Sequence, residues 1–147
     1  MHAPTRHRGV TTVEFAIVGG ILMLLVFGII EFGRIIFTLN VLQEGARRGA
    51  RVAAVCEVGN AGVANAAVFA RLPGLTTANV DVQYLDQNGN PTGAYEAIQY
   101  VRVRISGYRF RIYLPGVDAD FPVPAFTSTL PRESLGIPKF GQPAACY

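Results

Sequence analysis

Very few side chains in this 147-residue chain are suited to catalysis or metal binding. The two histidines, His2 and His7, both precede the long apolar segment near the N-terminus. If a leader that contains them is removed, the remaining chain has no histidine, which excludes Ser-His and Cys-His catalysis and any histidine-bound metal. The sequence also lacks a phosphate-binding glycine loop of the P-loop or dinucleotide type. We therefore expect no catalytic residue, no metal site and no cofactor.

One carboxylate does lie in a place where chemistry is expected. In the stretch RHRGVTTVEF, residues 6–15, basic residues and Gly9 are followed by four residues and then by Glu14. Directly after Glu14 comes an uncharged apolar segment, from Phe15 to Ile30. A charge at membrane depth costs free energy and usually marks a function that involves a partner. The simpler interpretation is an interfacial carboxylate that reaches the lipid head groups.

The uncharged segment is close to the length of a membrane-spanning helix. Its sixteen residues fall short of the roughly 20 that cross a bilayer core, but counting from Val10 gives 21. A cleaved secretory signal would need a small-x-small site soon afterwards, and EFGRIIFTLN, residues 31–40, contains none. A plain N-terminal anchor fits the length, but it leaves Glu14 without a role.

The order of these features resembles the start of a type IV prepilin: basic residues, a glycine, four residues, a glutamate, an aromatic residue and a long apolar helix. Over residues 8–54, the sequence VEFAIVGGILMLLVFGIIEFGR followed by VLQEGARRGARVAA is similar to the TadE-like branch, the minor pilins or pseudopilins of tight-adherence (Tad) pilus systems. STLPRESLG near the end is also similar to that branch. Val10 departs from the best-known pilins, in which Phe is common at this position.

The resemblance implies that a membrane-embedded prepilin peptidase cuts between Gly9 and Val10. Cleavage would create an α-amino group at Val10, which is normally protonated near neutral pH. Glu14, followed by Phe15, would then meet the amine of its own or of a neighbouring subunit during assembly. The implied partners are the peptidase, other pilins or pseudopilins and the pilus assembly machinery. The implied location is the bacterial inner membrane, crossed once with the N-terminus cytoplasmic and the C-terminal domain periplasmic, or an extracellular pilus after assembly.

The function expected from this resemblance is structural, not enzymatic: a minor pilin or pseudopilin of a Tad-type pilus that takes part in assembly or adhesion. The alternative is a membrane-tethered extracytoplasmic binding domain with an uncleaved N-terminal anchor. Nucleic-acid binding is not expected, because residues 57–147 carry seven basic and seven acidic side chains and have no basic excess.

The elements that must position these residues form an α+β chain with a pilin-like spine. We expect a leader at 1–9, a long helix at 10–56 and an extracytoplasmic α+β domain at 57–147. Within the helix, about 10–30 would be transmembrane and 31–56 an exposed, amphipathic half. From Glu31 to Val55 the chain has no proline and is rich in good helix formers. Two pairs have the spacing of ion pairs along a helix, Glu31–Arg34 and Glu44–Arg48.

The C-terminal part predicts a short helix at 63–71 and then strands. Alternation of apolar and polar residues with period two marks strands within 79–85, 100–106 and 108–114, and a last strand is expected within 121–130. Gly107 shifts the alternation, which indicates a bulge or bend. We expect one antiparallel sheet with a single solvent-facing side, packed on the exposed half of the long helix.

Three further patterns have two interpretations each. Four arginines on the strands form either an adhesive stripe or simply the solvated face of the sheet (Arg102, Arg104, Arg109 and Arg111). The small-residue pairs in the long helix either allow another helix to pack closely or simply reflect the glycines that are common in membrane helices (Ala16/Gly20 and Gly45/Gly49). The two cysteines, Cys56 and Cys146, are predicted to pair if they lie in an oxidising compartment. Otherwise Cys56 is a buried small residue and Cys146 is free or bonded to another subunit.

Overall fold

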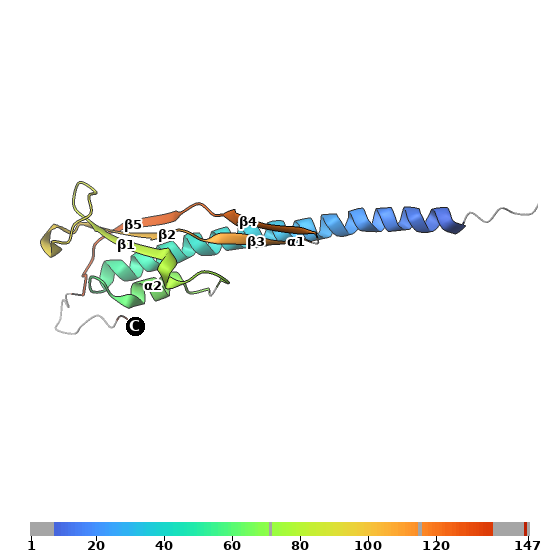
Figure 1. Cartoon of the computed structure of the whole chain (residues 1–147). Helices are drawn as coiled ribbons and strands as arrows, with labels where there is room; N and C mark the ends of the chain where they lie inside the picture. The colour runs from blue at the N-terminus through green and yellow to red at the C-terminus, as the bar shows by residue number, and fades with distance from the viewer. Residues whose placement is uncertain (1–7, 71, 115, 137–145, 147) are drawn as a thin grey trace, which may run out of the picture.

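The structure is a computed structural model that describes residues 8–70, 72–114, 116–136 and 146. The molecule is elongated, because the helix α1, Arg8–Val55, runs along its whole length and the rest of the chain packs on its C-terminal half (Figure 1). At 1.5 Å per residue, the 48 residues of α1 extend over about 72 Å. The long N-terminal helix expected from the sequence is confirmed.

The two halves of α1 have opposite environments. From Val10 to Ile30 the side chains are exposed, and no described part of the chain covers them. This half is long and apolar enough to cross a membrane. Burial begins at Glu31 and becomes complete along one stripe of the second half, where residues three or four apart share a face. Its innermost members are at most 1% exposed: Leu42, Ala46, Ala50 and Ala53.

The short helix α2, Ala61–Ala67, packs against the second half of α1. Its predicted bounds, 63–71, are wrong at both ends. It begins earlier because the Asn60 side chain caps it, accepting a hydrogen bond of 2.7 Å from the Gly62 N–H. It ends at Ala67, and the chain then turns so that Leu72 and Leu75 enter the core.

Three strands form an antiparallel sheet in the order β1-β2-β5: β1 is Val80–Leu85, β2 is Tyr100–Ile105 and β5 is Phe126–Pro131. Short 3-10 helices precede β1 (η1, Thr77–Asn79) and β2 (η2, Tyr95–Ala97). The expected alternation in β2 is confirmed, because Val101, Val103 and Ile105 are buried. This sheet and α1 enclose a core of small and branched apolar residues, in which Val101 and Val103 cluster with Ala50 and Ala53.

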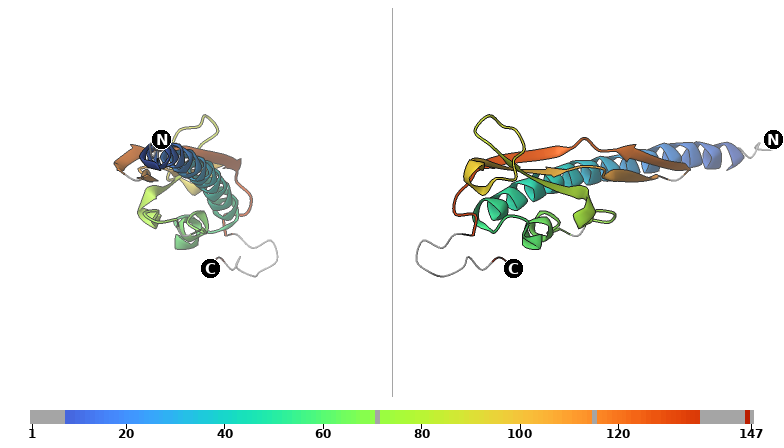
Figure 2. Two further views of the ribbon diagram at one scale, coloured as in Figure 1. Left: turned by 90° about the vertical axis from the view of Figure 1, so that its right-hand side faces the viewer. Right: turned by 60° about the vertical axis from the view of Figure 1, so that its left-hand side comes forward.

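A second, separate sheet replaces part of the single sheet that the sequence predicted. It is a hairpin of β3, Arg109–Leu114, and β4, Val117–Pro122. Gly107, with φ of +73°, lies at the break between the two sheets, so of the predicted bulge or bend it is the bend that forms, and the chain leaves the first sheet there. Figures 1 and 2 show this hairpin lying along α1 and extending toward the exposed N-terminal half of the helix. β3 also contacts α1.

Candidate assembly site

The predicted processing and assembly residues lie in the first two turns of α1. Gly9 and Val10 are helical, and residues 1–7 of the expected leader lie outside the described residues. Glu14 follows Val10 by four residues, so the two lie on the same face of the helix about 6 Å apart along its axis. Val10, Glu14 and Phe15 are all exposed, and Phe15 is 80% exposed. The structure therefore brings these residues together in the N-terminal turns of the helix, where no described residue outside α1 covers them.

The small-residue pairs in α1 fall into two environments. A Cβ atom added to Gly45 would collide with the backbone carbonyl oxygen of Ala67, and one added to Gly49 would lie 3.0 Å from Val103 Cγ1. These two glycines thus allow α2 and β2 to approach α1 within one chain. Around Gly20, in contrast, no described atom outside its own helix lies within 4 Å of such a Cβ position. Gly20 lies in the exposed half of α1, where it is open to contact by a neighbouring molecule as far as the described residues extend.

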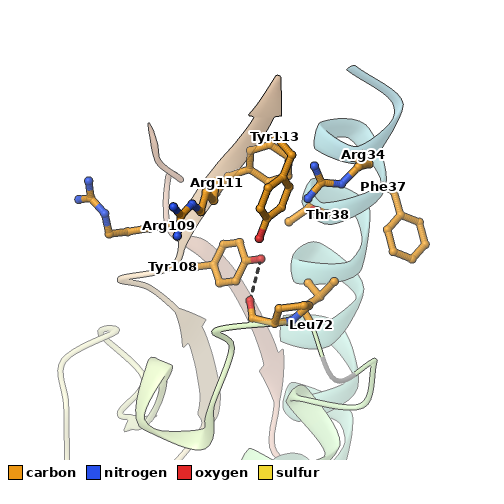
Figure 3. A pocket seen from close by; sticks show the side chains of 10 residues that line it. Arg34, Phe37, Thr38, Leu72, Tyr108, Arg109, Arg111 and Tyr113 are labelled. Carbon is orange, nitrogen blue, oxygen red and sulfur yellow. Dashed lines mark hydrogen bonds between the residues drawn. The ribbon is translucent and has the colours of Figure 1, made fainter. Parts of the chain in front are cut away.

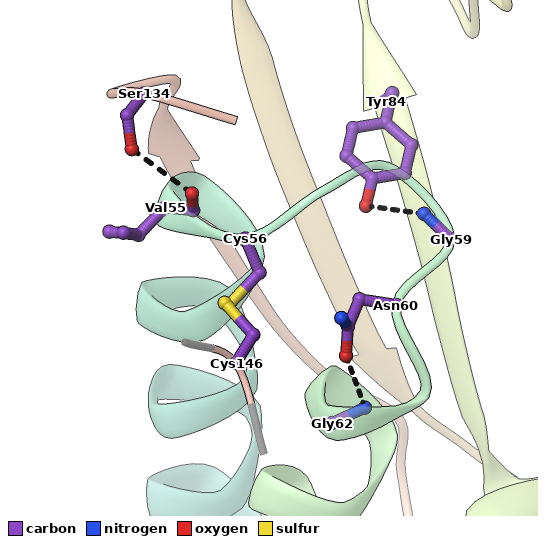
Figure 4. Close-up of a disulfide and its surroundings, with 8 residues drawn as sticks. All are labelled: Val55, Cys56, Gly59, Asn60, Gly62, Tyr84, Ser134 and Cys146. Atoms are coloured by element: carbon purple, nitrogen blue, oxygen red, sulfur yellow. Dashed lines mark hydrogen bonds between the residues drawn. A yellow bond between two sulfur atoms is a disulfide. The ribbon is translucent and has the colours of Figure 1, made fainter. Parts of the chain in front are cut away.

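At the other end of α1, the segment that follows β5 caps the helix. The last carbonyl groups of a helix have no partner within it. Here the Ala54 carbonyl accepts a hydrogen bond from the Glu133 N–H (3.0 Å), and the Val55 carbonyl accepts bonds from the Gly136 N–H (2.7 Å) and the Ser134 hydroxyl (3.0 Å). Figure 4 shows the Ser134 contact. The segment STLPRESLG, which resembled the TadE-like branch, therefore closes the end of the helical spine.

A disulfide joins Cys56, the residue after α1, to Cys146 (Figure 4). The Cα atoms are 5.8 Å apart and the two residues are 90 positions apart in the chain. Cys56 is buried, and its N–H continues the helical hydrogen bonding to the Val52 carbonyl. The predicted intrachain pairing is confirmed, and it holds Cys146 at the same helix end that residues 133–136 cap.

A third feature lies where the apolar half of α1 ends. Arg34 pairs with Glu31, a buried carboxylate, and its guanidinium lies over two aromatic rings of β3. The guanidinium carbon is 5.2 Å from the ring centre of Phe110 and 4.7 Å from that of Tyr113. Such cation–π contacts add to the packing of the hairpin on the helix. Arg34 thus fixes the position of β3 close to the boundary of the exposed apolar segment.

Beside Arg34 lies a pocket of about 370 Å³ between α1, β3 and the loop that follows α2 (Figure 3). The Tyr108 hydroxyl donates a hydrogen bond of 3.2 Å to the Pro73 carbonyl at its floor. Burial raises the pKa of the Tyr108 phenol, and the positive charge of Arg34 partly opposes this shift. Among the described residues no group of His, Cys, Asp or Glu could hold a metal ion. The pocket offers basic and phenolic groups but no nucleophile paired with a base.

The four strand arginines do not lie on one sheet. Arg102 and Arg104 belong to β2, whereas Arg109 and Arg111 belong to the β3–β4 hairpin. Arg102 donates to the Thr129 hydroxyl across the first sheet. The single stripe considered from the sequence is therefore divided between two separate surfaces.

Comparison with known proteins bears on the first half of the chain. Residues 9–51 match the family model described as TadE-like protein. The chain carries a TadE-like segment. This segment begins at Gly9 and includes Glu14, the exposed apolar half of α1 and most of its packed half. No curated protein and no solved structure matches the chain.

The TadE-like match confirms the family resemblance and supports, at family level, a Tad pilus-associated protein. The apolar half of α1 suggests a membrane anchor, and the family suggests a membrane-associated protein. Sequence reasoning found the residues at the start of α1 and the disulfide. It did not find the capping role of residues 133–136 or the aromatic contacts of Arg34, because both depend on segments that are far apart in the sequence.

Proposed function

We propose that this protein is a minor pilin or pseudopilin of a Tad-type pilus, which a prepilin peptidase cuts between Gly9 and Val10. The observation that carries the proposal is the exposed N-terminal half of α1 within the TadE-like segment, with Glu14 one turn from Val10. A stretch of 21 residues with a single carboxylate and no other charge suits a helix that is held first by a membrane and then by neighbouring subunits.

The chemistry of the cut end explains why Glu14 is needed. Before cleavage, the nitrogen of Val10 is an ordinary amide; afterwards it is an α-amino group that is mostly protonated at neutral pH. An unpaired carboxylate in a membrane or in an apolar filament interior is costly, and a nearby positive charge offsets that cost. Since Val10 and Glu14 share a helix face, the amine of the same subunit or of a neighbour can pair with the Glu14 carboxylate.

The proposed topology places the N-terminus in the cytoplasm and the folded part in the periplasm. The disulfide between Cys56 and Cys146 supports this arrangement, because such bonds persist in oxidising compartments and are rare in the cytosol. The proposed partners are the peptidase, the other pilins of the system and the assembly machinery, within the inner membrane.

Glu14→Gln tests the pairing, because it keeps the size of the side chain and removes the charge. We expect normal insertion into the membrane but at least a tenfold loss of pili and of co-purification with partner pilins from solubilised membranes. The matched control is Glu44→Gln, which removes a carboxylate that pairs with Arg48 on the packed half of the same helix. Normal piliation by Glu14→Gln would show that Glu14 is only an interfacial charge.

A further inference from the structure

We propose that the end of the β3–β4 hairpin formed by Tyr113, Leu114 and Val117 inserts into the head-group region of the same membrane that α1 crosses, beside the point where the helix leaves the lipid. This inference rests on α1 spanning a membrane, but not on cleavage at Gly9 or on assembly into a pilus. The partner is a phospholipid bilayer surface, recognised by apolar and aromatic side chains.

The length of the apolar segment sets the level of the membrane surface. The residues from Val10 to Ile30 extend over about 31 Å as a helix, which matches the roughly 30 Å of hydrocarbon in a bilayer. The head-group region therefore begins near Glu31. Arg34 lies about 6 Å farther along the helix axis than Ile30.

The hairpin reaches this level. Its Tyr113 ring is in contact with Arg34, and the hairpin runs from there toward the N-terminal half of α1 (Figure 1). The turn joins Leu114 to Val117, and each strand residue advances about 3.3 Å. The last strand pair, Leu114 and Val117, thus lies about 3 Å beyond Tyr113, close to the depth where the apolar segment of α1 ends.

The side chains at this level are the kind that bind a membrane interface. On the hairpin, Tyr113 and Val117 are 62% and 47% exposed, and on α1 Phe32 is 64% exposed. Phe32 lies two residues after Ile30, where the exposed apolar half of α1 ends. Aromatic residues, Tyr in particular, are enriched where one end of the side chain meets lipid and the other meets water.

Backbone chemistry limits the depth of the insertion. A two-stranded hairpin has free N–H and C=O groups on its outer edges, and such groups are not tolerated in hydrocarbon. The turn therefore stays within the outermost 5–10 Å or so, where water is present. Charge does not select an anionic lipid, because Arg34, next to Tyr113, is already paired with Glu31.

Tryptophan scanning tests the proposal cleanly, because the chain contains no tryptophan. Three full-length variants are reconstituted in phosphatidylcholine vesicles: Tyr113→Trp at the turn, Phe27→Trp in the apolar half of α1 and Tyr100→Trp as the distant control. Tyr100 begins β2, whose next residues pack near Ala50 and Ala53, about 24–29 Å farther along α1 than Arg34. Lipids brominated near the head group quench tryptophans that lie within the interface.

We expect bromine quenching at position 113 to be at least twice that at position 100, with the opposite order for aqueous iodide. Val117→Trp should behave like Tyr113→Trp, and it replaces that variant if the latter does not fold by circular dichroism. If position 27 is quenched and position 113 behaves like position 100, the hairpin lies in water and the proposal is wrong while the anchor stands. If position 113 loses its protection from iodide when the protein is diluted in lipid, a second copy covers the turn and the proposal is likewise wrong.

Discussion

Removing the disulfide between Cys56 and Cys146 should cost a large part of the stability of the folded half. The bond joins positions 90 residues apart, and in the chain-entropy model a loop of that length contributes about 4–5 kcal/mol to the free energy of unfolding. Domains of this size are stable by roughly 5–15 kcal/mol in total. The hydrogen bonds from residues 133–136 to the end of α1 remain without the disulfide, so the fold should persist and show the loss as a shift in its unfolding transition.

Urea unfolding of the full chain in detergent measures this loss. Near-UV circular dichroism of the tyrosines reports on the folded half, while the apolar half of α1 stays in the micelle. If the free energy of unfolding falls by about 2 kcal/mol per molar urea, the unfolding midpoint of Cys146→Ser should lie roughly 2 M below that of the oxidised wild type. Reduced wild-type protein is the matched control and should unfold at the same midpoint as the variant. A midpoint within about 0.3 M of the oxidised wild type would refute the argument that the bond constrains the unfolded chain.

Two pairs of glycine substitutions test the packing around α1 and its cap. Gly45→Val should lower the free energy of unfolding by about 1–3 kcal/mol because its side chain meets the backbone of α2, whereas Gly33→Val, in open space, should change it by less than about 0.5 kcal/mol. Gly136→Ala should lower the free energy of unfolding more than Gly89→Ala does. Both glycines have φ near +80°, but only the added Cβ atom at Gly136 would meet Glu57. Urea midpoints that rank the other way would contradict the capping role.

The parts of the fold that could be predicted from the sequence are those fixed by local periodicity. The absence of proline and the run of good helix formers predicted α1, and strict alternation predicted β1, β2 and β3. The hairpin strand β4 was missed because VDADFP combines two aspartates with a proline and has low strand propensity. Its formation depends on pairing with β3 and on the contact of that strand with α1.

The candidate site shows the same division. Gly9, Val10 and Glu14 could be recognised because their spacing is local, and the disulfide could be predicted because the chain has two cysteines. The cap formed by Ser134 at Val55 joins residues 79 positions apart, so no local pattern reveals it. The aromatic contacts of Arg34 likewise appear only when β3 folds back onto the helix.

The N-terminus of the mature protein tests the proposed function most directly. Intact mass and N-terminal sequencing of protein purified from membranes of its native host should show a chain that begins at Val10 and has lost residues 1–9. Gly9→Leu, which places a large side chain at the cleavage site, should leave the longer chain in the same membranes. A wild-type chain that keeps its leader would contradict processing as a pilin and would favour a membrane-tethered binding domain with an uncleaved anchor.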